Sequence, residues 1–332
     1  MSNSEVQTQA DTTDAAAKQS WKSSIDPKGA FVRKESQFRN WITADGSSGY
    51  KAEADRYHLY VSLACPWAHR TLIVRSLKGL GDVISVTVVD WLLETKGWAF
   101  TDKKPKCDLD RVNGCSYLRE VYEKSDKDYG GNVTVPCLWD KHTGTIVNNE
   151  SSEIIRMFNS EFQAFCKTPE QHDLDLYPAA LRAEIDAIND WIYPQINNGV
   201  YRSGFAKSQE AYNEAVSGVF DGLDKVEQIL SSKRYLTGKN VTEADVRLFT
   251  TLIRFDTVYH THFKTNKKRI VDYPNIWGYV RDIYQLPGVS ATVDQEHIMK
   301  HYFVSHKHIN PTGIVPVGPE LDFLAAHGRD KL

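Results

Sequence analysis

Cys65 lies at the junction of two contrasting segments, and a cysteine thiolate is a strong nucleophile. Residues 57–63 alternate in polarity and are rich in β-forming side chains, which predicts a strand. Pro66 suits the first turn of a helix, and the helical pattern that follows ends at Gly79. Because a helix N-terminus stabilises an anion, this position predicts that the pKa of Cys65 falls from about 8.5 to roughly 3.5–7.5.

The motif that starts at this thiol is Cys-Pro-Trp-Ala, so Ala68 stands where a second, resolving cysteine would be. A disulfide formed at Cys65 must therefore be resolved by another molecule, and glutathione is the abundant candidate. The competing interpretation is a buried structural cysteine, which is the common fate of an isolated Cys. The order of strand, Cys, Pro and helix favours the reactive thiol.

The composition is that of an ordinary globular chain, with 332 residues of which 41% are hydrophobic and 25% are charged. This length suggests two domains, and the net charge of −3 gives no reason to expect nucleic-acid or membrane binding. The five cysteines are scattered, so we expect a reducing compartment, the cytoplasm. No apolar run reaches transmembrane length, and residues 1–20 show neither a secretory nor a mitochondrial signal.

The first half of the chain predicts a thioredoxin-like α/β domain. The strand before Cys65, its helix and the β-branched run at 83–89 form a βαβ unit with parallel strands. A polar insertion follows at 92–130 and includes a short helix at 117–122.

The rest of this domain should be a hairpin and a helix. Residues 133–140 predict a strand interrupted by Pro136, and a cis bond before this proline would expose the backbone of Val135 to a ligand. A turn leads into a strand at 145–148, and a helix opens at Glu150.

Beyond residue 161 the pattern becomes almost entirely helical. Apolar side chains recur at i, i+3/i+4 spacing, and the helix expected over Val246–His260 should be the centre of a second domain. The predicted segments are an N-terminal extension or arm at 1–55 with a disordered start at 1–20, a thioredoxin-like domain at 56–161, a linker at 162–175, an all-helical domain at 176–309 and a C-terminal tail at 310–332.

In this order and spacing, five strings resemble the glutathionyl-hydroquinone reductases, the Xi class of glutathione transferases. The resemblance covers roughly residues 30–320 and implies the cytosolic glutathione transferase fold, an α/β thioredoxin-like domain followed by an all-α domain. It also implies a homodimer that uses glutathione as co-substrate. The strings are Cys65-Pro66-Trp67-Ala68-His69-Arg70, Gly97-Trp98-Ala99-Phe100, Val133-Thr134-Val135-Pro136, Asn148-Asn149-Glu150-Ser151-Ser152-Glu153-Ile154-Ile155-Arg156, and Leu236-Thr237-Gly238 with Ala244-Asp245-Val246-Arg247-Leu248.

The resemblance implies roles for residues within these strings. Cys65 resembles the nucleophile, and Val135 resembles the residue whose backbone pairs with the cysteinyl part of glutathione. Glu150 and Ser151 resemble the pair that holds the γ-glutamyl end, where an acid meets the ammonium and a hydroxyl meets the carboxylate. The alternative for this pair is a plain helix cap. Trp98 resembles an aromatic wall of the glutathione pocket, with core packing as the alternative.

Three tyrosines, Tyr201, Tyr259 and Tyr302, fall where the resembled family has active-site tyrosines. Phenol hydroxyls donate to a phenolate while their rings pack against its ring, so they suit an aromatic substrate. Asn132 departs from the family pattern, because many members carry Arg directly before the Val-Thr-Val-Pro strand. The departure removes one possible charge contact to a glutathione carboxylate.

The implied reaction is glutathione-dependent reduction of glutathionyl-hydroquinones to hydroquinones through a mixed disulfide at Cys65, with release of oxidised glutathione. An omega-like glutathione transferase with thioltransferase or dehydroascorbate reductase activity is the first alternative. The second is a non-catalytic binding or regulatory module, against which Cys65, Glu150 and Ser151 together argue. Histidine pairs at 260/262, 297/301 and 306/308 lack an accompanying cysteine or carboxylate cluster, so we expect no metal.

Overall fold

A four-stranded mixed sheet organises the first half of the computed structural model, which describes residues 24–332. β3 and β4 are parallel and joined by helix α2 (Pro66–Leu77), whereas β7 is antiparallel to both of its neighbours. The thioredoxin-like prediction is confirmed, and the predicted disordered start at 1–20 lies outside the described residues. The strand order is β4 (Ser85–Val88), β3 (Tyr57–Val61), β7 (Cys137–Asp140) and β8 (Thr145–Asn148).

The strand expected over 133–140 begins later than predicted. The peptide bond between Val135 and Pro136 is cis, as the sequence analysis anticipated. Pro136 has no N–H to give to a sheet ladder, so regular pairing starts only at Cys137. Val135 therefore lies just outside the sheet, beside the start of α2.

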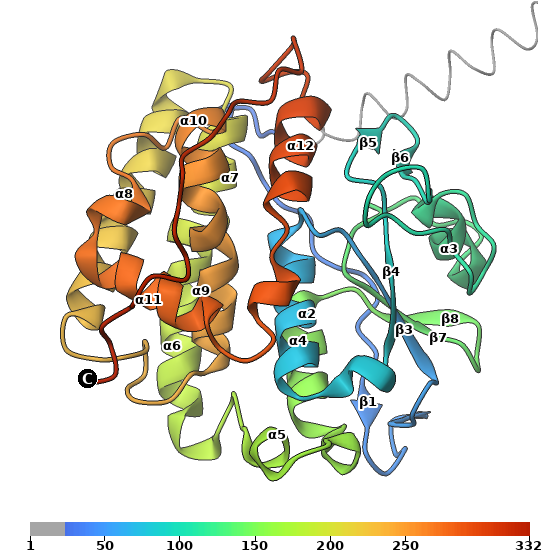
Figure 1. The fold of residues 1–332 in the computed structure, drawn as a ribbon. Coiled ribbons are helices and arrows are strands. Elements are labelled where there is room, and N and C mark those ends of the chain that lie inside the picture. Colours follow the sequence, from blue (N-terminus) through green and yellow to red (C-terminus); the bar gives the residue numbers. More distant parts are fainter. Residues whose placement is uncertain (1–23) are drawn as a thin grey trace, which may run out of the picture.

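Short elements surround the sheet. In the insertion, β5 (Leu93–Glu94) pairs with β6 (Gly97–Trp98), and α3 (Leu118–Ser125) follows. Figure 1 shows the β5–β6 hairpin beside α12 (Gln295–Ser305), and the Leu93 N–H donates to Ser305 Oγ at 3.0 Å. A further two-stranded piece, β1 (Ile42–Thr43) with β2 (Tyr50–Lys51), precedes β3.

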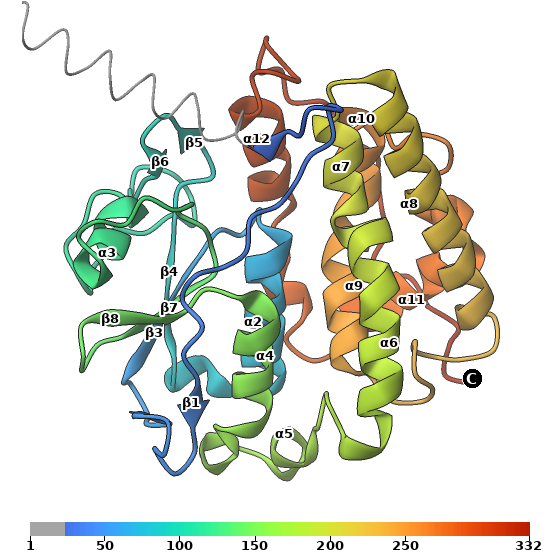
Figure 2. The same cartoon turned by 180° about the vertical axis from the view of Figure 1, so that it is seen from behind.

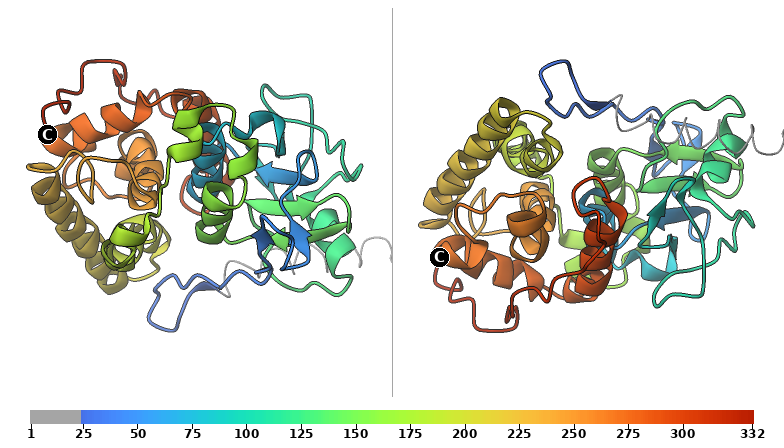
Figure 3. Two further views of the ribbon diagram at one scale, coloured as in Figure 1. Left: turned by 90° about the horizontal axis from the view of Figure 1, so that it is seen from below. Right: turned by 90° about the horizontal axis from the view of Figure 1, so that it is seen from above.

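Helices form the second half, and α2 and α4 lie between them and the sheet (Figure 3). None of the helices within residues 24–332 is both long and apolar enough to cross a membrane. The segment expected to be a linker contains a helix of its own, α5, which Thr168 caps. The remaining helices are α4 (Ser151–Ser160), α5 (Pro169–Asp173), α6 (Arg182–Ile192), α7 (Gly199–Phe205), α8 (Gln209–Leu230), α9 (Glu243–Arg254), α10 (His260–His262) and α11 (Pro274–Tyr284).

The helix expected over Val246–His260 is interrupted. α9 ends at Arg254, and the π-helical turn η6 (Phe255–Tyr259) separates it from α10. A similar π-helical turn, η5 (Tyr193–Asn197), precedes α7. Such turns inside helices are frequent at functional sites, and η6 carries one of the three tyrosines singled out above.

The chain before β1 crosses from one half to the other. Figure 2 shows this arm running from β1 past α4 toward α7 and α10. Phe38 packs on Tyr122 with ring centres 5.7 Å apart, whereas Phe31 packs on Phe205 of α7 at 5.2 Å. The arm therefore ties the helical half to the sheet half across the space between them.

A buried ion pair joins the start of β3 to the end of β7. Arg56 donates to both carboxylate oxygens of Asp140, at 3.0 and 2.7 Å. The carboxylate also accepts from the His142 N–H and the Thr143 hydroxyl. Burial acts to raise the pKa of Asp140, but Arg56 and these hydrogen bonds together hold it below its ordinary value.

We predict that Asp140→Ala lowers the free energy of unfolding by about 3–5 kcal/mol, because the buried guanidinium of Arg56 then loses its buried partner and keeps only the part-exposed Glu53. Urea denaturation followed by circular dichroism measures the loss. Asp55→Asn is the matched control, since Asp55 pairs with Lys141 at the exposed surface and should contribute little. Equal destabilisation in the two variants would contradict the importance of the buried pair.

Candidate active site

A large open pocket lies where the arm, the sheet half and the helical half meet. Its walls include the arm at 31–39, the turn at Cys65, the β5–β6 hairpin, residues 130–136, the start of α4, and parts of α7 and α12. Its volume is about 2560 Å³. Sites for one drug-sized ligand span roughly 300–1,000 Å³, so this pocket has room for a peptide together with a second group.

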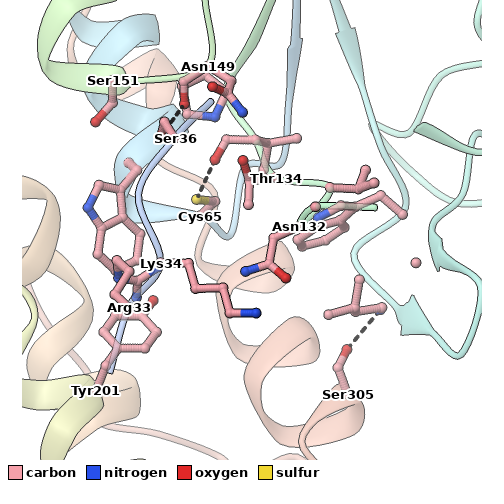
Figure 4. Close-up of a pocket in the computed structure, with 18 of the residues that line it drawn as sticks. Arg33, Lys34, Ser36, Cys65, Asn132, Thr134, Asn149, Ser151, Tyr201 and Ser305 are labelled. Atoms are coloured by element: carbon pink, nitrogen blue, oxygen red, sulfur yellow. Dashed lines mark hydrogen bonds between the residues drawn. The ribbon is translucent and has the colours of Figure 1, made fainter. Parts of the chain in front are cut away.

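Cys65 is the N-cap residue of α2, and its half-buried thiol opens into this pocket (Figure 4). The thiol donates to the Val135 carbonyl at 3.4 Å. The backbone N–H groups of Trp67 and Ala68, in the first turn of the helix, also act on the sulfur. The strand-to-helix turn thus presents the thiol as the sequence predicted.

The direction of the Cys65 pKa contradicts the sequence prediction. Burial raises the pKa of this thiol above its ordinary value, although two backbone N–H groups and the charges of Arg254 and Arg33 act to lower it. The physical reason is desolvation, because removing a thiolate from water costs more here than the helix end supplies. In the unliganded pocket Cys65 therefore rests as a thiol.

The three tyrosines form one hydrogen-bonded cluster. Tyr201 on α7 and Tyr259 on η6 each bond through the hydroxyl to Tyr302 on α12, the second of them at 3.0 Å. Burial raises the pKa of all three phenols, so they are neutral hydrogen-bond donors. All three side chains are buried, and Tyr201 and Tyr302, but not Tyr259, line the pocket.

Glu150 and Ser151 lie at the N-terminus of α4. Glu150 is the N-cap residue, and its carboxylate accepts from the N–H and the hydroxyl of Ser152 at 3.0 and 2.8 Å. It also accepts from Ser36 of the arm at 3.1 Å. Burial acts to raise the pKa of Glu150, but these hydrogen bonds and the charge of Arg70 together hold it below its usual value. The capping alternative is therefore present, and both residues still line the pocket.

Arg70 is a buried cation close to the N-terminus of α4. Arg70 donates to Ser151 Oγ at 3.3 Å, and its Nε has no partner among the described residues. Burial lowers the pKa of Arg70 to about 9, which still leaves it charged at neutral pH. This end of the pocket thus combines a carboxylate with helix N–H groups and a guanidinium, which suits a zwitterionic α-amino acid group.

The opposite end of the pocket carries Trp98, Asn132 and Lys34. Trp98 is mostly buried and stacks on His301, with ring centres 5.1 Å apart. It therefore both lines the pocket and packs against α12. Asn132 is exposed, and in Figure 4 the ammonium group of Lys34 extends toward it. The arm thus brings a positive charge to the place where the sequence lacks an arginine.

Several pocket residues escaped the sequence analysis. Arg33 of the arm lies 3.8 Å from the centre of the Trp67 ring and donates to Asn198 at 3.1 Å. Trp67 packs in turn on Tyr201, with ring centres 4.9 Å apart. Trp67 belongs to the Cys-Pro-Trp-Ala string and was within reach of prediction. Arg33 had no signal, because its partners are distant in sequence.

The C-terminal histidines make separate contacts. His297 and His301 donate to the carbonyls of Pro105 and Trp91, both at 2.8 Å, and His262 bonds to His306 at 3.1 Å. Burial lowers the pKa of His301 and His262 to about 4, so both are neutral. Within residues 24–332, no group of three His, Cys, Asp or Glu side chains is arranged to hold a metal ion.

Comparison with known families gives two matches along the chain. Residues 64–161 match the family described as glutathione S-transferase, N-terminal domain, and residues 209–282 match the glutathione S-transferase, C-terminal domain. The chain is 55% identical over 316 residues to the glutathionyl-hydroquinone reductase YqjG of Escherichia coli (strain K12), with 93% of this chain and 95% of that protein covered. It is 49% identical over 308 residues to the glutathionyl-hydroquinone reductase PcpF of Sphingobium chlorophenolicum, with coverages of 92% and 95%.

Solved structures agree with these matches. The glutathione-bound structure of YqjG superimposes with a TM-score of 0.85 at 57% identity, covering 88% of this chain and 96% of that one. The Xi glutathione S-transferase of Phanerochaete chrysosporium gives a TM-score of 0.84 at 53% identity, with coverages of 87% and 97%.

We predict that alkylation of Cys65 by iodoacetamide in the unliganded protein accelerates with pH and has its midpoint above the ordinary value of about 8.5. The sign follows from the raised pKa, because the reactive thiolate forms only as the pH passes that value. Cys166 is the other partly exposed cysteine, so the Cys166→Ser background isolates the signal, with the additional change Cys65→Ser as blank. A midpoint below 7 would contradict the prediction.

Proposed function

The chain belongs to the glutathione transferase family, in the Xi class of glutathionyl-hydroquinone reductases, and on that premise we propose that it reduces glutathionyl-hydroquinones to hydroquinones with glutathione. The observation that carries this proposal is the meeting, in one pocket, of a single thiol with a cluster of neutral phenol donors. A zwitterion-binding helix end on the other side of the thiol supports glutathione as the co-substrate.

The first chemical step is a displacement at sulfur. The Cys65 thiolate attacks the glutathione sulfur of the thioether, so that an S–S bond forms and the bond between sulfur and the aromatic carbon breaks. Before this step the ring carbon that carries the sulfur takes up a proton while a ring hydroxyl loses one, which gives the keto form. The electron pair of the broken bond then passes through the ring to that oxygen, which takes up a proton as the free hydroquinone leaves. The enzyme is left as a mixed disulfide with glutathione.

The second step restores the thiol. The thiolate of a second glutathione attacks the sulfur of the bound glutathione, which releases oxidised glutathione and returns Cys65 as a thiolate. The sum is one glutathionyl-hydroquinone and one glutathione converted to one hydroquinone and one oxidised glutathione. Since no second cysteine follows in the motif, each turnover needs this external thiol, and ping-pong kinetics are expected.

The pocket offers a place for each part of glutathione. We infer that Glu150 and Ser151 hold the γ-glutamyl end and that Val135 pairs with the cysteinyl backbone beside the thiol. Trp98 would form a wall of the site. Lys34, which extends into the far end of the pocket, would replace the missing arginine charge beside Asn132.

The hydroquinone would lie against the tyrosines. Tyr201 and Tyr302 face the pocket and donate to the phenol oxygen of the leaving group, where negative charge develops. Tyr259 acts through Tyr302, because it bonds to that hydroxyl and does not itself line the pocket. Neutral phenols whose side chains are buried are strong donors to such an oxygen.

We also infer a homodimer in the cytoplasm, with the domain boundaries given by the sequence analysis. The C-terminal tail at 310–332 runs over the helical half and exposes several apolar side chains, which favours pairing through this half. The exposed side chains are Ile314, Val317 and Leu324. Sedimentation at micromolar concentration distinguishes monomer from dimer.

Glutathione affinity should depend on the charge of Glu150. Glu150→Gln keeps an oxygen that can cap Ser152 but removes the charge that faces an ammonium, which should weaken binding about ten- to a hundredfold. Isothermal titration calorimetry measures the dissociation constant. Glu153→Gln is the control, since Glu153 lies in the same helical turn but pairs with Arg39. Equal effects in both variants would remove Glu150 from the binding site.

Substrate class should be decided by the tyrosines. Tyr201→Phe and Tyr302→Phe each remove one hydroxyl, and a lost hydrogen bond of about 1–3 kcal/mol corresponds to roughly a 5- to 150-fold fall in hydroquinone-thioether reduction. Tyr259→Phe should cost less. Reduction of a small mixed disulfide through Cys65 should change little, because that substrate has no phenol.

The comparison of two substrates also tests the omega-like alternative. If neither activity falls in the tyrosine variants, the phenol does not bind there and a thioltransferase becomes the better description. If both activities fall equally, the tyrosines serve the fold or glutathione itself.

A further inference from the structure

Arg254, the last residue of α9, is a fully buried guanidinium beside the active-site turn. It donates to the carbonyls of Leu63 and Ala64, at 3.0 and 2.9 Å. These are the two residues that precede Cys65 in the chain. A third carbonyl, that of Thr250 in its own helix, accepts at 2.7 Å. One side chain of the helical half therefore holds the loop that presents the thiol.

This buried cation has no carboxylate partner in the described part of the chain. Arg56, Arg156 and Arg234 each pair with at least one buried or half-buried acid, but no ion pair joins Arg254 to an Asp or Glu. Burying a charge that only neutral groups surround is unfavourable unless something offsets it. Within the described residues, no acidic side chain therefore compensates the positive charge of Arg254 beside the nucleophile.

The one further contact of Arg254 adds no charge. Its guanidinium donates to His69 Nδ1 at 2.9 Å, which requires that nitrogen to be unprotonated. The proton of the neutral ring is then on Nε2, which bonds to the Thr292 hydroxyl at 2.8 Å. Burial and the neighbouring Arg254 hold the pKa of His69 well below its ordinary value.

We propose that Arg254 is a positioning residue whose buried charge compensates the negative charge that forms at Cys65 and at the tyrosine-bound oxygen during the reaction. This inference rests on the proposed function for its second part, whereas the first part concerns the thiol alone. The guanidinium does not touch the substrate. It acts by the field that it supplies to the pocket, and its bonds to the Leu63 and Ala64 carbonyls fix where that charge lies.

The electrostatics of the neighbouring groups agree with this role. The charge of Arg254 acts to lower the pKa of Cys65 and also those of Tyr259 and Tyr302, against the opposite effect of burial. The same guanidinium thus favours the anionic form of the nucleophile and of two of the phenols. That pattern fits a cation that lies near both the nucleophile and the phenol cluster.

Other charged and titratable groups also face the thiol. Arg33 approaches from the arm and Arg70 from α2, while Tyr201 and Tyr259 approach from α7 and η6. The phenols stay neutral across the range in which a thiol titrates, because burial raises their pKa values. Arg33 packs on Trp67, and Arg70 bonds to Ser151, so neither holds the Cys65 loop.

The test measures Cys65 directly, without any quinone substrate. Iodoacetamide alkylation of Cys65 at pH 7.5 should slow about tenfold or more in Arg254→Gln, since loss of a nearby opposite charge moves a pKa by roughly one unit or more. Arg329→Gln is the matched control. Arg329 is also buried and donates to the carbonyls of Leu230, Lys233 and Arg234. It lies three residues before the C-terminal residue, which Figure 1 shows on the far side of the helical half.

A merely structural role predicts that both variants lose stability and that neither changes the alkylation rate of the folded protein. That result, with folding checked by circular dichroism, would overturn the proposal. If Arg254→Gln does not fold, Arg254→Lys decides the matter, because it keeps the charge and loses most of the hydrogen bonds. The proposal expects an alkylation rate within about threefold of the unmodified protein, and a tenfold loss in folded Arg254→Lys would overturn it.

The reductase assay then tests the second part. With a glutathionyl-hydroquinone, kcat/KM should fall by more than the alkylation rate falls, because the ring oxygen that takes up the electron pair loses the same compensation. A fall equal to that of alkylation would confine Arg254 to the thiol and overturn the second part. An unmodified protein without reductase activity would contradict the proposed function, while the alkylation result would still decide the first part.

Discussion

The geometry of the site depends on one contact between the halves, the guanidinium of Arg254 against the loop before the thiol. Its hydrogen bonds to the Leu63 and Ala64 carbonyls join the end of α9 to the loop before α2. The π-helical turn that carries Tyr259 begins at the next residue, and its hydroxyl bonds to Tyr302. The same junction therefore fixes the thiol on one side and the phenol cluster on the other, although the two come from different domains of the fold.

Burial has opposite effects on the phenols and on the thiol of this pocket. It keeps Tyr201 and Tyr302 neutral, so that their hydroxyls are available as donors, and it strengthens the bonds that they make. It also raises the pKa of Cys65, so the resting nucleophile is protonated. Burial of these side chains thus favours the departure of a phenol and opposes the formation of the thiolate, and the nearby cations offset the second effect only in part.

Local signals in the sequence were sufficient for the elements around the thiol. The strand, the proline and the helix next to Cys65 follow from patterns within twenty residues, as does the capping position of Glu150. The direction of the Cys65 pKa could not be predicted in this way, because desolvation comes from side chains brought together by the whole fold. The importance of Arg254 was equally hidden, since its partners lie about 190 residues earlier.

Other differences have the same origin. The late start of β7 follows from Pro136, so the sequence could almost have predicted it. The interruption of the helix after Arg254 could not be predicted, because the periodicity of the apolar residues does not change there. The tyrosines were found through resemblance and not through spacing. The structure adds that Tyr259, unlike the other two, does not line the pocket. This depends on how the helices pack and cannot be predicted from spacing.

Several contacts of this protein join segments that are far apart in the chain. Residues near position 30 lie against α7, with Lys28 and Ser208 joined across 180 positions, and Leu93 reaches Ser305 across 212. During synthesis on a ribosome, the thiol-bearing turn emerges long before the helices that enclose it. Arg254, whose charge acts on Cys65 in the folded protein, is made about 190 residues after the thiol, so the nascent chain carries this thiol for most of its synthesis without that cation. Loss of α12, for example by a premature stop codon, would remove Tyr302 and leave the other two phenols without the hydroxyl that joins them.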